Sequence, residues 1–131
     1  MSTALEVDIV TPERSVFRGA AAQVQLPAWE GEMGVLPDHD PLLALLRAGL
    51  CVVSTAQGAT RYVIGRGFAE IGGDRVTILT DHCEPAEKVD KASAQTELAA
   101  AEAEMAQHDA WSERYRQARI AYELARARLD A

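Results

Sequence analysis

The residues best suited to acid–base chemistry lie in one short stretch of this 131-residue chain. His39 stands between Asp38 and Asp40, in a segment bounded by Pro37 and Pro41. A histidine in such a turn could act as a general acid or base. No Ser, Cys or Lys stands nearby to complete a nucleophile arrangement, so we interpret His39 as a structural residue of a turn.

Two other patterns could bind a metal or a nucleotide. His82 and Cys83 are adjacent, whereas a zinc site needs a second ligand pair at suitable spacing. Gly65-Arg66-Gly67 follows an expected strand, but another strand follows it, whereas a dinucleotide fingerprint opens a helix. The sequence therefore predicts no metal site, no dinucleotide site and no catalytic residue.

Composition excludes several further classes of function. The net charge of −7 argues against nucleic acid, because phosphate binding needs clustered Lys and Arg. No apolar run approaches the roughly 18 residues that span a bilayer, and the first residues lack a signal-peptide pattern. The two cysteines, Cys51 and Cys83, fit a reducing compartment. We expect a protein on the cytoplasmic side.

A sharp change in composition divides the chain near residue 86. All nine glycines and all five prolines come before it. The remaining residues, dominated by Ala, Glu, Arg and Gln, favour helix. We predict one domain over residues 1–86 and a second over 87–131, with the boundary between Glu84 and Asp90.

The first part alternates in the way that half-buried strands do. Leu5, Val7 and Ile9 share one face of an expected strand. Similar runs occupy residues 15–19, 20–28, 49–55, 59–65, 68–72 and 74–80, and Gly72-Gly73-Asp74 is typical of a hairpin turn. With no helical pattern between these runs, we predict an antiparallel β-sandwich or flattened barrel.

The second part predicts an antiparallel helical hairpin. Asp90 caps a first helix, the pattern pauses near His108, and Asp109 or Ser112 caps a second helix that ends around Leu129. The first helix has a narrow apolar line of Leu98, Ala101 and Met105. The second is expected to carry a stripe on one side, made of Trp111, Tyr115, Tyr122 and Leu129.

Charge divides between the two expected helices, with six acids and two lysines over 87–109 against five arginines and three acids over 110–131. Arg116, Arg119 and Arg126 share one side of the second helix. This side is either a solvated face with ion pairs between the helices or the docking face of a detachable helix for an acidic partner.

A resemblance to a known family covers almost the whole chain. The run EGEMGVLPDHDPLL (30–43), followed by Leu46-Arg47-Ala48-Gly49, resembles the signature of the epsilon subunit of F-type, proton-translocating ATP synthases. VDIVTPERSVFRGAAAQVQLPA and YVIGRGFAEIGGDRVTILTDHCE are similar to the family's opening strands and second glycine-rich hairpin. The resemblance implies a sandwich followed by a helical hairpin.

The resemblance also implies a non-catalytic subunit of the rotary central stalk, which couples proton flow to ATP synthesis. Its sandwich would bind the c subunits of the rotor ring and the gamma subunit. The protein would lie peripherally on the cytoplasmic face of a bacterial inner membrane, without inserting into it. Implied rotor-ring contacts are Glu32, Glu30 and Met33. Implied gamma contacts are His39, Val35, Leu36 and Pro41, next to an Asp40 that replaces the family's usual small residue.

The hairpin of the family lies folded on the sandwich or extends along gamma as a brake on hydrolysis. Implied contacts with an acidic segment of the catalytic beta subunits are Arg116, Arg119, Arg126, Arg114 and Arg128, and the alpha subunits are implied as further partners. Some relatives bind ATP through an I/L-D-x-x-R-A run. Here Ser93 replaces that arginine, a phosphate partner. We therefore expect no cofactor, and at most weak nucleotide binding through Asp90, Arg119 and Arg126.

Three hypotheses remain open on the sequence. The chain is a stalk subunit with a regulatory hairpin, a stalk subunit whose hairpin is purely structural, or a free-standing module that binds a small ligand. The third predicts function without partners, and no convergent polar group in the sequence supports it.

Overall fold

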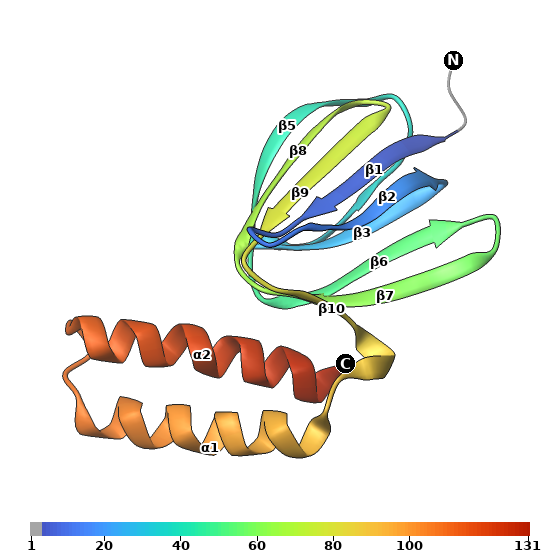
Figure 1. Cartoon of the computed structure of the whole chain (residues 1–131). Helices are drawn as coiled ribbons and strands as arrows, with labels where there is room; N and C mark the ends of the chain where they lie inside the picture. The colour runs from blue at the N-terminus through green and yellow to red at the C-terminus, as the bar shows by residue number, and fades with distance from the viewer. Residues whose placement is uncertain (1–3) are drawn as a thin grey trace.

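Ten β-strands precede two α-helices in the computed structural model, which describes residues 4–131 (Figure 1). The strands are β1 (Leu5–Val10), β2 (Ser15–Ala21), β3 (Gln23–Ala28), β4 (Gly31–Val35), β5 (His39–Leu46), β6 (Gly49–Thr55), β7 (Gly58–Ile64), β8 (Gly67–Gly73), β9 (Arg75–Thr80) and β10 (Cys83–Pro85). A 3₁₀ turn, η1 (Ala86–Lys88), leads to α1 (Lys91–Gln107) and α2 (Glu113–Asp130).

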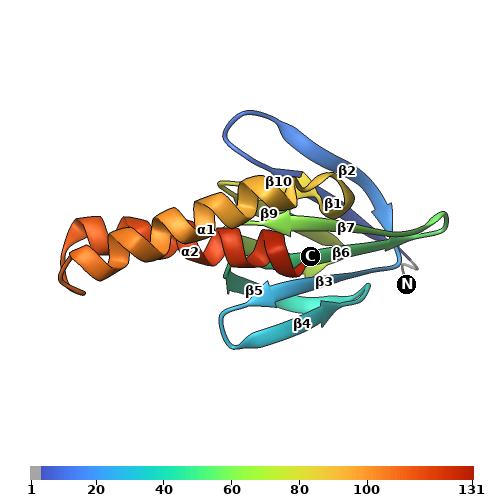
Figure 2. The ribbon, with the colours of Figure 1, turned by 90° about the horizontal axis from the view of Figure 1, so that it is seen from below.

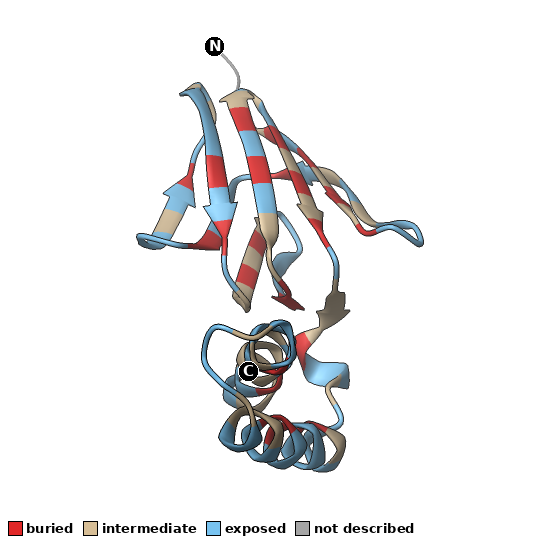
Figure 3. Cartoon of the chain, turned by 90° about the vertical axis from the view of Figure 1, so that its left-hand side faces the viewer, coloured by how far each residue is buried: buried red, intermediate tan, exposed pale blue. Residues whose placement is uncertain are grey.

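The strands form one sheet that curls into a sandwich around a single core. Their order is β10-β7-β6-β3-β5-β8-β9-β1-β2, and β4 pairs with β3. Buried and exposed residues alternate along them, as the banding in Figure 3 shows. Leu5, Val7 and Ile9 point into the core, where Leu26 and Ile78 are also fully buried. The predicted fold class is confirmed.

One pairing departs from the antiparallel prediction. β1 and β9 run parallel, with Glu6 opposite Arg75 and Val10 opposite Leu79. Every other ladder among the described residues is antiparallel. Alternation in a sequence specifies which face of a strand is buried, but not which strand lies beside it or in which direction.

The stretch 30–43 is more regular than its glycines and prolines indicate. It forms β4 and the first part of β5, so the prediction that His39 lies in a turn is wrong; His39 is the first residue of β5. Gly31 and Asp38, with φ of 132° and 63°, make the reversals before and after β4. Pro41 fits because the β5–β8 register shifts between His39 and Leu42, which relieves the need for its missing N–H.

The helical hairpin begins at caps that the sequence indicates. The N–H of Ser93 donates to Oδ1 of Asp90 (3.1 Å), and the N–H of Tyr115 donates to Oγ of Ser112 (3.2 Å). Each bond satisfies one of the free N–H groups at a helix start. Nζ of Lys91 donates to the carbonyl of Arg128 at 2.9 Å, which ties the start of α1 to the end of α2.

The predicted stripe on the second helix is wrong at its first member. Trp111 precedes α2 and is 96% exposed. The residues that the helices bury against each other and the sandwich are mostly alanines: Ala94, Leu98, Ala101, Ala118 and Ala125. Small side chains let two helices approach closely, so shape rather than aromatic bulk packs this pair.

The hairpin lies across one end of the sandwich. Figures 1 and 3 show α2 between α1 and the strands, and Figure 2 shows the loop end of the hairpin projecting beyond them. α2 contacts β6 and β7. The sandwich therefore supports only part of the hairpin.

Candidate functional site: an exposed apolar face and a docked hairpin

A row of large apolar side chains faces outward from β5. Leu43 and Leu45 are 61% and 62% exposed, while the intervening Ala44 and the following Leu46 point into the core. Phe68 of β8 lies opposite Leu45, and Leu79 of β9 lies opposite Phe68. We call Leu43, Leu45, Phe68 and Leu79 the outer apolar face; Leu79, at its edge, is half-buried. Contiguous exposed apolar surface of this kind marks an interaction site.

Most of the sandwich residues implied as partner contacts are accessible. Glu30 and Glu32 are exposed at the β3–β4 reversal, and Leu36 is 56% exposed. Pro41 is exposed, and His39 is half-buried with its Nδ1 2.6 Å from the carbonyl oxygen of Asp40.

Two implied contacts lie deeper. Met33 is half-buried against the core, and the side chain of Val35 is fully buried. Val35 therefore supports the surface from beneath and does not form part of it.

An ion pair joins the sandwich to the hairpin at the middle of α2. Nε and Nη2 of Arg66 donate to the two carboxylate oxygens of Glu123, each at 2.9 Å. The guanidinium of Arg66 also lies 5.3 Å from the ring centroid of Trp29, and that of Arg47 lies 5.5 Å from it. Stacking of this kind holds an arginine in place.

A second polar contact lies at the hinge, where β10 leads toward α1. Nε of Arg128 donates to Glu84 at 2.6 Å, and its Nη1 donates to Glu97 at 3.1 Å. Nε2 of His82 lies 3.1 Å from the same Glu84 oxygen. Burial raises the pKa of Glu84, but the bonds to Arg128 and His82 outweigh it, so the pKa is lower than usual.

The implied brake arginines divide into two groups. Arg114, Arg116, Arg119 and Arg126 have side chains more than half exposed, and each pairs within the hairpin. The side chain of Arg128 is only 11% exposed and belongs to the hinge. In the docked hairpin, Arg128 is therefore not available to a partner.

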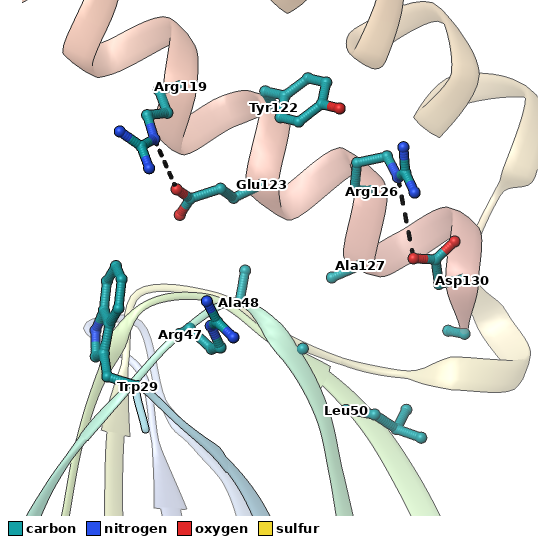
Figure 4. A pocket seen from close by; sticks show the side chains of 12 residues that line it. Trp29, Arg47, Ala48, Leu50, Arg119, Tyr122, Glu123, Arg126, Ala127 and Asp130 are labelled. Atoms are coloured by element: carbon teal, nitrogen blue, oxygen red, sulfur yellow. Dashed lines mark ion pairs between the residues drawn. The ribbon is translucent and has the colours of Figure 1, made fainter. Parts of the chain in front are cut away.

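A cavity of about 480 Å³ opens between α2 and the loop that joins β5 to β6 (Figure 4). Arg119 and Arg126 line it with Trp29 and Arg47, but Asp90 does not. Asp90 instead caps α1. The structure thus does not gather the three residues named for weak nucleotide binding.

The thiols of Cys51 and Cys83 lie in surroundings that keep them protonated. Burial raises the pKa of Cys51 to about 12 and that of Cys83 to about 11, so both thiols stay protonated and unreactive near neutral pH.

Within residues 4–131, no cluster of three or more His, Cys, Asp or Glu is placed to hold a metal. Neither helix described is long and apolar enough to cross a bilayer.

Sequence reasoning missed the ion pair that docks the hairpin, Arg66 with Glu123, and the Trp29 ring beside which Arg66 and Arg47 lie. Arg66 was noted only inside Gly65-Arg66-Gly67. No local pattern pairs positions 66 and 123, because the contact depends on where the hairpin lies.

The fold defines a class of small proteins with a β-sandwich and an appended helical hairpin. The model of the ATP synthase Delta/Epsilon chain, beta-sandwich domain, matches residues 4–86, and the chain belongs to this family. The ATP synthase epsilon chain of Magnetococcus marinus is 33% identical over 131 residues, 100% of this chain and 96% of that one. That of Rhodobacter capsulatus is 38% identical over 81 residues, 62% of this chain and 61% of that one.

Solved structures agree with the assignment. A chain in the Euglena gracilis mitochondrial ATP synthase (OSCP/F1/c-ring, rotational state 1) superposes with a TM-score of 0.81 and 26% identity, covering 97% of this chain and 80% of that one. A chain of the Tetrahymena thermophila mitochondrial ATP synthase central stalk/c-ring shares the fold, with a TM-score of 0.55 at 12% identity over 65% of this chain and 69% of that one.

Proposed function

We propose that this chain is a rotor subunit of the central stalk of an F-type ATP synthase, where its sandwich binds gamma and the c-subunit ring. The observation that carries the proposal is the outer apolar face. Leu43 and Leu45 are exposed side by side on one strand, although the same strand buries Ala44 and Leu46 in the core. A face with this pattern is stabilised when a partner covers it.

Exposed carboxylates at the β3–β4 reversal support the proposed contact with the c-ring. Glu30 and Glu32 are exposed there, at the end of a hairpin that pairs with the sandwich only through β3. Carboxylates in such a position would pair with arginines on polar loops of the ring. In this arrangement the subunit turns with the ring at the cytoplasmic face of the bacterial inner membrane, without entering the bilayer, and couples proton flow to synthesis on the alpha and beta subunits.

The hairpin is proposed as the regulatory part. Two polar contacts, Arg66–Glu123 and Arg128–Glu84, hold it against the sandwich. The exposed arginines Arg114, Arg116, Arg119 and Arg126 would meet an acidic segment of the beta subunits when the hairpin leaves the sandwich. Partly exposed ion pairs each contribute little to the free energy of docking. The docked and released forms can therefore differ by only a few kcal/mol, so that a partner can shift the balance between them.

ATP hydrolysis by the reconstituted catalytic head tests the proposal, with the full chain and with a chain truncated after Ala86. Faster hydrolysis on truncation, with the head assembled, is expected if the hairpin is a brake, and Arg119→Glu or Arg126→Glu should reproduce part of it. Failure of both forms to bind gamma would overturn the stalk assignment itself.

A purely structural hairpin is the second candidate. The contacts around Arg128 favour it, because that side chain is 11% exposed and bonds two carboxylates, Glu84 and Glu97. Equal hydrolysis rates with the full and truncated chains would establish this alternative.

A further inference from the structure

A groove lined by arginines runs between α2 and the loop that joins β5 to β6. Its cationic side chains are Arg47, Arg119 and Arg126, which line the cavity of about 480 Å³ together with Trp29 and Tyr122. Figure 4 shows Arg47 on the sandwich side and Arg119 and Arg126 on the helix side. We call this set the arginine groove. Its two walls come from the two parts of the chain that can separate.

Arg47 is the member that the fold leaves without an acid. Its guanidinium lies 5.5 Å from the Trp29 ring centroid, and no ion pair of Arg47 exists within residues 4–131. Stacking on an aromatic ring fixes an arginine while leaving its N–H groups free. Arg47 is therefore a positioned donor that faces the cavity.

The groove also has an excess of guanidinium over carboxylate groups. Glu123 and Asp130 are its acidic side chains. Glu123 accepts both donors of Arg66 from outside the groove and also pairs with Nε of Arg119 at 3.3 Å, so Arg47 carries the uncompensated charge. Arg126 and Asp130 are 4.0 Å apart, at the limit of an ion pair. A local excess of positive charge in a chain of net charge −7 is a binding feature for an anionic partner.

From this geometry we infer that the arginine groove binds an acidic peptide segment of a partner protein and thereby holds the hairpin docked. Arg119 and Arg126 are two helical turns apart, about 10 Å along the axis. Carboxylates on a peptide reach such a span across about three extended residues. A single small anion would satisfy only one end of it.

The consequence for the hairpin follows from linkage. A ligand that touches Arg47 on the sandwich and Arg126 on α2 binds only the docked form with full affinity, so it shifts the population toward that form. This contact is distinct from the proposed brake contact, in which the helix arginines meet their acidic segment after the hairpin has left the sandwich.

The test uses the full chain with Trp111→Phe, which leaves Trp29 as the only tryptophan and the reporter of the groove. Hexaglutamate is titrated at low salt while Trp29 emission is recorded, and isothermal titration of the unmodified chain gives an independent affinity. Removing one positioned charge is expected to weaken binding about fivefold in Arg47→Gln and in Arg126→Gln. Arg61→Gln, an exposed arginine of β7, is the matched control and should bind normally.

Hydrogen exchange of the α2 amides reports the docking. Saturating hexaglutamate is expected to slow exchange; faster exchange would mean that the peptide binds the released helix and would overturn the inference. Equal affinity for Arg47→Gln and Arg61→Gln would overturn it too, as would equally tight binding of inorganic phosphate or ATP. The inference rests on the proposed detachable hairpin, but its readouts involve no hydrolysis, so its failure leaves the hydrolysis test unaffected.

Discussion

Arg66 and Glu123 form a two-bond ion pair that joins the sandwich to the middle of α2. The residues are 57 positions apart in sequence, and their side chains are 30% and 24% exposed. The guanidinium of Arg66 also lies 5.3 Å from the Trp29 ring centroid, and both residues belong to the sandwich, so this contact does not require the helix. Docking therefore needs little loss of side-chain freedom on the sandwich side.

Replacing Arg66 with Gln should loosen the hairpin by about 0.5–1.5 kcal/mol, because Glu123 loses both donors while Arg119 still reaches it at 3.3 Å. Hydrogen exchange of α2 amides measures the change, and the sandwich amides provide the internal reference. A double-mutant cycle with Glu123→Gln isolates the pair; coupling near zero would contradict the role assigned to it.

The hinge should weaken in acid. The pKa of Glu84 in the folded chain lies below its ordinary value of 4.5. Its contribution to stability is therefore complete above the unfolded pKa and is lost as the pH falls through the lower folded pKa. Glu84→Gln should lower the free energy of unfolding by about 1 kcal/mol at pH 7 and flatten this acid-dependent part. Unfolding curves between pH 3 and 7 provide the measurement. If the free energy of unfolding of the variant falls with pH as steeply as that of the unmodified chain, the role assigned to Glu84 is contradicted.

Leu45 and Leu46 are adjacent but should respond in opposite ways to substitution. Leu46→Ala should cost about 2–5 kcal/mol, because its side chain is fully buried. Leu45→Ser should change stability by no more than about 0.5 kcal/mol and weaken binding to gamma. Denaturant unfolding and a gamma pull-down compare the two. Retained gamma binding in Leu45→Ser would show that the outer apolar face is not the contact.

Gly67 is required because the backbone of the neighbouring strand passes close to it. A Cβ at this position would collide with the carbonyl of Leu79 on the neighbouring strand. Gly67→Ala should therefore destabilise the chain by about 1–3 kcal/mol, the usual cost of overpacking. Gly34→Ala, at a position with open space around it, is the matched control. Thermal unfolding of both variants checks the expectation, which equal midpoints would contradict.

The parts of the fold that local patterns encode were predicted correctly. Alternation of Leu5, Val7 and Ile9 identifies β1, and Asp90 identifies the start of α1. For α2 the sequence offered Asp109 or Ser112, and the cap is Ser112. β4 and β5 escaped because Gly31 and Pro41 read as turn residues, although the register shift in β5 tolerates the proline.

The docking contacts could not be found from local patterns. The burial of Arg128 and the pairing of Arg66 with Glu123 depend on the angle at which the hairpin returns to the sandwich. The same holds for Arg47, whose exposed charge looks ordinary in sequence and becomes distinctive only beside Trp29 and α2. The resemblance to a family implied partners, but it did not imply these intramolecular contacts.

The parallel pairing of β1 with β9 sets the order in which this chain can fold. The hairpins β6–β7 and β8–β9 join neighbours in sequence, and their contacts form with short loops to close. β1 must wait for residues 75–79, since Glu6 pairs with Arg75 and Val10 with Leu79. During synthesis on the ribosome, β1 therefore stays unpaired on that edge until β9, nearly at the end of the sandwich, has been made.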